Sequence, residues 1–76
     1  MPHVIVKMYE GRSAAQKAAL AEAVTQAVIA AHGCKAEAVS VGIEDVAPSD
    51  WTASVYEPDI IAKPDTIFKQ PGYDPR

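Results

Sequence analysis

The 76-residue sequence contains a single cysteine, Cys34, so no disulfide can form within the chain. One cysteine and the two separated histidines, His3 and His32, also lack the spacing of a zinc site. No apolar run reaches the roughly 20 residues of a membrane span, and the start lacks the charged-then-apolar pattern of a signal peptide. We therefore expect a cytoplasmic protein without a bound metal or a membrane partner.

Positive charge is scarce as well, with 7 Lys and Arg against 10 Asp and Glu and a net charge of −3. No cluster of basic residues offers a surface for nucleic acid or an anionic membrane. A chain this short buries a small share of its surface, so its own core gives it little stability. Without a disulfide or a metal, the remaining source of additional stability is self-association. We therefore predict one domain, residues 1–76, that forms a homo-oligomer.

The first segments read as a strand followed by a helix. "HVIVKMY", His3 to Tyr9, alternates between two faces with period two and predicts a strand. Ser13 and Gln16 form a capping-box pattern that predicts a helix from Ala14, and Gly33 is suited to end it in the left-handed conformation. Five residues at helical spacing are expected to face a sheet: Leu20, Val24, Ala27, Val28 and Ala31.

"AVSVGIEDV", residues 38–46, predicts a second strand. Two strands joined by a long helix form a right-handed βαβ crossover with parallel strands, so the expected fold class is α+β. One helix covers only one face of such a sheet. The other face would expose Ile5, Tyr9, Gly42 and Val46, and we expect a second copy to cover it, so that subunits pair into an oligomeric sheet.

The C-terminal part is expected to hold a short helix that begins near Ser49, followed by a tail over residues 63–76. Its prolines, Pro58, Pro64, Pro71 and Pro75, predict that no long regular element forms here. Three apolar residues are expected to anchor the tail on its own core or on a neighbour: Ile67, Phe68 and Tyr73.

Pro2 has a chemical property that no other proline in the chain can have. If Met1 is removed, its nitrogen becomes a secondary amine, which can accept and return a proton. Burial and a nearby cation both disfavour the protonated form, and a general base works best when its pKa lies near the operating pH.

The chain resembles the 4-oxalocrotonate tautomerase family from Pro2 to Trp51. The resemblance rests on Pro2, the "EGRS" turn with Arg12, the capped helix, the second strand and Trp51. The resemblance implies a cofactor-independent tautomerase acting on an enol of an α-keto acid. It implies Pro2 as the base, Arg12 as the group that binds and polarises the substrate, and Trp51 as an apolar pocket wall. The segment "PDTIFKQPGY" resembles the longer tails of dimeric members, which favours a dimer over a hexamer.

Ser40 occupies the position where well-known members carry a second arginine, so recognition of a dicarboxylate is not expected. It has no histidine at a recognisable spacing and is not expected to be a nucleophile, but its hydroxyl could orient a substrate oxygen. His3 is expected to pair or position neighbouring groups rather than act as the base.

Two other functions stay open. The same proline could assist hydration or dehalogenation of a haloacrylate, with Glu44 or Asp45 activating water. Alternatively, the assembly could be a non-catalytic oligomer that binds a small acid or a protein, and retention of Met1 would favour this because the nitrogen of Pro2 would then be an amide.

Overall fold

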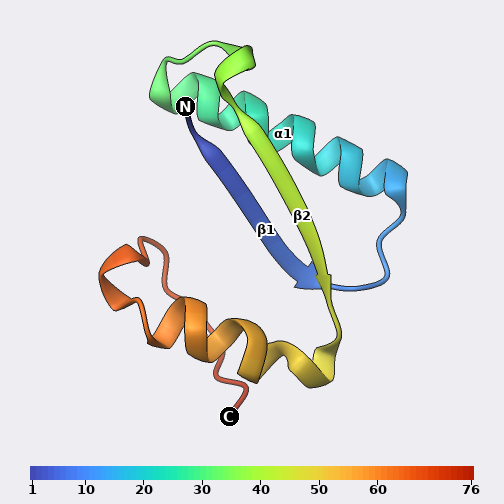
Figure 1. Cartoon of the computed structure of the whole chain (residues 1–76), viewed down its shortest axis with the longest axis vertical. Helices are drawn as coiled ribbons and strands as arrows, with labels where there is room; N and C mark the ends of the chain where they lie inside the picture. The colour runs from blue at the N-terminus through green and yellow to red at the C-terminus, as the bar shows by residue number, and fades with distance from the viewer. The chain divides into compact units, whose positions relative to one another are not determined.

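The computed structural model describes the whole chain, Met1–Arg76, and divides it into two compact units, residues 1–45 and 46–76. The first unit contains strand β1 (His3–Tyr9), helix α1 (Ala14–His32), a short 3-10 helix η1 (Ala36–Ala38) and strand β2, which runs from Ser40 to Val46. β1 and β2 form a two-stranded parallel sheet, and α1 lies along one of its faces (Figure 1). The predicted α+β fold and its βαβ connection are therefore confirmed.

Helix α1 begins and ends where its capping residues predict. The Ser13 hydroxyl accepts a hydrogen bond from the Gln16 amide at 3.1 Å, and the Gln16 side chain accepts one from the Ser13 amide at 2.8 Å. At the other end Gly33 has φ 83°, a conformation that favours glycine, and its amide bonds to the Ile29 carbonyl at 2.9 Å. The capping box and the terminal glycine are both confirmed.

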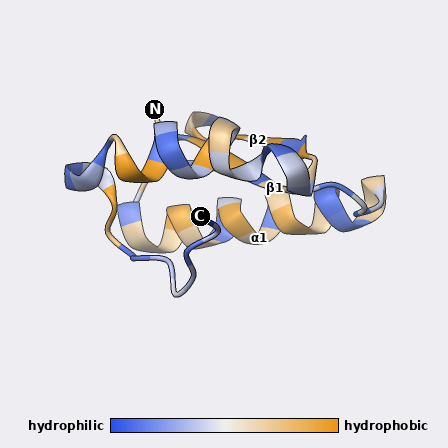
Figure 2. Ribbon diagram, turned by 90° about the horizontal axis from the view of Figure 1, so that it is seen from below, coloured by the Kyte–Doolittle hydropathy of each residue, from blue (hydrophilic) through white to orange (hydrophobic).

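The face of α1 that is turned from solvent differs in part from the predicted one. Ala27 and Ala31 were expected on this face, but both are exposed. Leu20, Val24 and Val28 share it instead with residues one position further along the chain, such as Ala21 and Ile29. The pattern was ambiguous because α-helical neighbours lie at both i+3 and i+4, and alanines on both sides of the stripe gave no contrast. Figure 2 shows this mixture of hydrophobic and hydrophilic residues along α1.

A polar contact joins the start of α1 to the end of β2. The Lys17 ammonium group lies 2.6 Å from a carboxylate oxygen of Asp45, and both side chains are partly exposed. Partly exposed pairs of this kind contribute about 0.2–1 kcal/mol, so this contact adds little to the stability of the fold.

The second unit begins with a 3-10 helix, η2 (Pro48–Asp50), close to the predicted start near Ser49. It continues into a ten-residue π-helix, η3 (Thr52–Ile61), and another 3-10 helix, η4 (Pro64–Thr66). Pro58 lies inside η3, but this helix ends at Ile61 and only the three-residue η4 follows, so no long regular element forms in this part of the chain, as predicted. A proline ring clashes with the carbonyl four residues earlier in an α-helix, whereas π winding pairs each amide with the carbonyl five residues back. The Ala62 amide makes such a bond to the Glu57 carbonyl at 2.9 Å.

The end of the tail packs on η3 of its own unit. The ring of Tyr73 lies 5.7 Å from the ring of the buried Tyr56. The Arg76 guanidinium lies 5.2 Å from the centre of the Tyr56 ring. Arg76 also donates hydrogen bonds to both carboxylate oxygens of Asp74, which lowers the pKa of Asp74 from 3.8 to about 2. Tyr73 is thus an anchor as predicted. Phe68 is 98% exposed, so it does not anchor the tail on its own chain, and its contact with a neighbouring chain stays a prediction.

Hydrophobic burial in the single chain is limited. Only Val55 and Tyr56 are buried, whereas Ile5 and Tyr9, on the sheet face turned away from α1, remain 51% and 49% exposed. These two apolar side chains, on either side of Lys7 on one strand face, are candidates for a contact with another chain.

Candidate active site

Pro2 and Ser40 lie side by side at the edge of the sheet where both strands begin. The Ser40 amide donates a hydrogen bond to the Pro2 carbonyl at 3.2 Å, which continues the ladder between the strands by one residue. Pro2 is half-buried, and Ser40 is exposed. In a parallel sheet the starts of both strands meet at one edge, so two predicted site residues 38 positions apart become neighbours.

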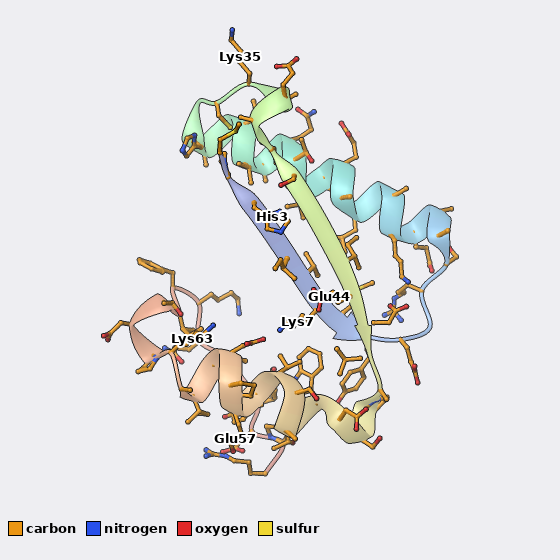
Figure 3. The ribbon with its side chains drawn as sticks, in the orientation of Figure 1. His3, Lys7, Lys35, Glu44, Glu57 and Lys63 are labelled. Atoms are coloured by element: carbon orange, nitrogen blue, oxygen red, sulfur yellow. The ribbon has the colours of Figure 1, made fainter.

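His3 joins this pair. Its Nδ1 atom lies 2.6 Å from the Ser40 hydroxyl, and both side chains are exposed. Figure 3 labels His3 on β1. Ser40, which has no histidine at a recognisable spacing in the sequence, therefore has His3 as its partner in the fold. Sequence spacing hides the contact because the two residues are separated by the whole crossover, but the expected parallel register could have revealed it. The pairing role expected of His3 is confirmed.

Arg12 lies in the turn between β1 and α1. The turn depends on Gly11, whose φ of 120° lies in the region that residues with a side chain rarely adopt. Ser13 follows as the helix cap. Arg12 is thus held between two fixed backbone positions, and its side chain is exposed.

Within one chain the structure does not bring Arg12 to Pro2. Pro2 precedes the first residue of β1, and Arg12 follows the last. A seven-residue strand with a rise of roughly 3.3 Å per residue separates its ends by roughly 20 Å. No side chain spans this distance. Arg12 can therefore approach only the Pro2 of another copy of the chain.

Trp51 belongs to the second compact unit, between η2 and η3. Its indole N–H donates a hydrogen bond to the Tyr73 hydroxyl at 3.1 Å, and the side chain is half-buried. The bond fixes the orientation of the indole ring and leaves part of its surface accessible.

No group of three or more His, Cys, Asp or Glu side chains is arranged to hold a metal ion. None of the helices is both long enough and apolar enough to cross a membrane.

Comparison with known proteins places this arrangement in a family. Residues 2–56 match the family model of the tautomerase enzymes. A probable tautomerase of Xylella fastidiosa is 44% identical over 73 residues, which cover 96% of this chain and 89% of that protein. Tautomerase PptA of Cronobacter sakazakii is 36% identical over 75 residues, 97% of this chain and 99% of that protein.

A solved structure agrees with the sequence comparisons. The crystal structure of TomN, a 4-oxalocrotonate tautomerase homologue in the tomaymycin biosynthetic pathway, superposes with a TM-score of 0.64 and 42% sequence identity. The match covers 66% of this chain and 77% of TomN. The sequence resemblance drawn from Pro2, Arg12 and Trp51 is thus confirmed. The chain belongs to the 4-oxalocrotonate tautomerase family and is an enzyme of the tautomerase type.

Proposed function

We propose that this enzyme interconverts the enol and keto forms of an α-keto acid without a cofactor, and that Pro2 is its general base once Met1 is removed. The observation that carries the proposal is the bond between the Ser40 amide and the Pro2 carbonyl. It holds Pro2 at a defined place on the sheet edge, so the freed amine would not be a loose chain end. All 76 residues act as one tautomerase domain, and the unpaired Cys34 favours the cytoplasm.

The chemical step needs a base that is neutral before the reaction. Neutral Pro2 removes the proton from the enol hydroxyl, and its protonated form then returns a proton to the carbon of the enol double bond. A positioned general base contributes about 10²–10⁴ in rate. The remainder must come from orientation of the substrate and from stabilisation of the developing enolate charge.

Arg12 supplies that stabilisation from a second copy of the chain. Its planar guanidinium can donate two parallel hydrogen bonds to a carboxylate and offset negative charge on the enolate. Because it lies at the far end of β1 from Pro2, the site is complete only where two chains meet. The exposed Ile5 and Tyr9 side chains provide a surface for that contact, and we propose a homodimer.

Trp51 supplies an apolar wall. Its ring orientation is fixed by the hydrogen bond to Tyr73. An aromatic or aliphatic part of the substrate would pack on its accessible surface.

The substrate class follows from Ser40. A substrate with a carboxylate at each end needs a charged partner at each. With a neutral serine hydroxyl rather than an arginine beside Pro2, where the reacting end binds, Arg12 is the one proposed cation, and it cannot bind both carboxylates. We therefore propose that the enzyme prefers monocarboxylate enols with an apolar far end.

Comparison of phenylenolpyruvate with 2-hydroxymuconate tests this preference. The wild-type kcat/KM should be higher for phenylenolpyruvate. Ser40→Arg should move the ratio toward 2-hydroxymuconate by roughly five- to thirtyfold, since the added charge-assisted bond is worth about 1–2 kcal/mol. Ser40→Gln, which adds length without charge, is the matched control. A wild type that already favours the dicarboxylate would show that another cation, such as Lys7 or Lys63, binds the second carboxylate.

A further inference from the structure

His3 and Ser40 form a polar pair beside Pro2. The Nδ1 atom of His3 lies 2.6 Å from the Ser40 hydroxyl, and the Ser40 amide is bonded to the Pro2 carbonyl. On the same sheet face, Lys7 and Glu44 lie farther along the strands, toward their C-terminal ends (Figure 3). Neighbouring strands lie about 4.8 Å apart, so the Ser40 hydroxyl is within the length of a small substrate from Pro2.

The pair differs chemically from an arginine at this place. A guanidinium can only donate hydrogen bonds, whereas a hydroxyl can donate and accept, and a neutral imidazole nitrogen can do either. When His3 Nδ1–H donates to the Ser40 oxygen, the hydroxyl hydrogen is left for another acceptor. When the hydroxyl donates to Nδ1, its oxygen is left to accept. The pair can therefore serve both an enol hydroxyl and a keto oxygen.

We propose that the His3–Ser40 pair binds the substrate oxygen that changes from hydroxyl to carbonyl, and that this is a specificity-determining contact for the reaction. The inference rests on the proposed function and deepens it. Ser40 touches the oxygen: with His3 Nδ1–H donating to its oxygen, the Ser40 hydroxyl donates to a lone pair of the enol oxygen, and it continues to donate to the enolate after Pro2 has removed the enol proton. His3 is a positioning residue that acts through Ser40 by fixing the direction of the hydroxyl.

The location of the pair supports this role. The enol oxygen lies two bonds from the carbon that Pro2 protonates, so a group that binds this oxygen must lie close to Pro2. Ser40 is the residue bonded to Pro2 across the sheet, and both side chains of the pair are exposed in the single chain, at the end of this sheet face opposite to Tyr9. A donor that meets charge developing in the transition state contributes to kcat more than to KM.

A double-mutant cycle on phenylenolpyruvate ketonisation tests the pair. Ser40→Ala should lower kcat by about five- to tenfold, the loss expected for one hydrogen bond to a developing charge. His3→Leu should lower kcat by a similar or smaller factor. The double variant should lose no more than Ser40→Ala alone, because His3 acts only through the hydroxyl. Ser40→Thr and His3→Asn, which keep the hydroxyl and a side-chain N–H, should retain most of the activity.

The matched controls are His32→Leu, at the end of α1, and Ser49→Ala, in η2, and neither should change kcat. Multiplicative losses in the double variant, or an unchanged kcat in Ser40→Ala, would overturn the inference. So would losses that follow dissociation of the assembly in sedimentation, since the pair would then be an interface contact. An active Ser40→Ala beside an inactive Pro2→Ala would refute the pair alone, whereas an unaffected Pro2→Ala would refute the proposed function itself.

Discussion

Pro2→Ala, with Met1 removed, is expected to lower kcat for ketonisation of phenylenolpyruvate by at least about tenfold, because the primary amine of alanine is a more poorly matched base than the secondary amine of proline. KM should change less, since the amine acts on the reacting proton rather than on the rest of the substrate. The assay follows the appearance of the ketone at saturating substrate.

Two controls separate chemistry from folding in that experiment. Pro64→Ala replaces an exposed proline at the start of η4 and should leave kcat unchanged. Circular dichroism should show that both variants keep the helix content of the wild type. An unchanged kcat in Pro2→Ala would end the proline mechanism.

Arg12→Ala is expected to raise KM and lower kcat together, because one guanidinium holds the substrate carboxylate and stabilises the enolate charge. The combined loss in kcat/KM should be at least about tenfold, as expected for a charge-assisted bond of about 1.5–3 kcal/mol. Arg12→Lys keeps the charge but not the planar pair of donors, and it should recover only part of the loss. If neither constant moves in Arg12→Ala, Arg12 is a solvated turn residue.

The separation of Pro2 and Arg12 along β1 allows a stricter test. When Pro2→Ala and Arg12→Ala chains are unfolded together and refolded as mixed dimers, a shared site regains activity. In a twofold-symmetric dimer about one quarter of all sites would then combine an intact Pro2 with an intact Arg12. Each variant refolded alone should stay impaired. A mixture without any gain would mean that the two residues do not meet across a subunit contact.

The local elements of the fold could be predicted because short-range chemistry determines them. Ser13, Gln16 and Gly33 fix both ends of α1, and the alternation from His3 to Tyr9 defines β1. The second unit was less predictable. A proline ordinarily breaks a helix, and nothing in the local pattern around Pro58 indicates π winding, which depends on packing of the whole segment.

The sequence was enough to choose candidate site residues, but not to predict the distances between them. Pro2, Arg12 and Ser40 could each be selected by chemical type and by resemblance. Their distances depend on the crossover, which places Ser40 beside Pro2 and sends Arg12 to the opposite end of β1. The His3–Ser40 contact is a tertiary pairing of the same kind, and it becomes visible only when both strands are aligned.

The most direct test of the proline mechanism is the intact mass of the active protein, measured together with its activity. Pro2 can act as a base only when its nitrogen is an amine, so the mass of the active species should be that of the sequence without Met1. In a preparation that contains both forms, activity should rise in proportion to the fraction that lacks Met1. Equal activity in chains that retain Met1 would contradict the mechanism, because the nitrogen of Pro2 is then an amide with no basicity.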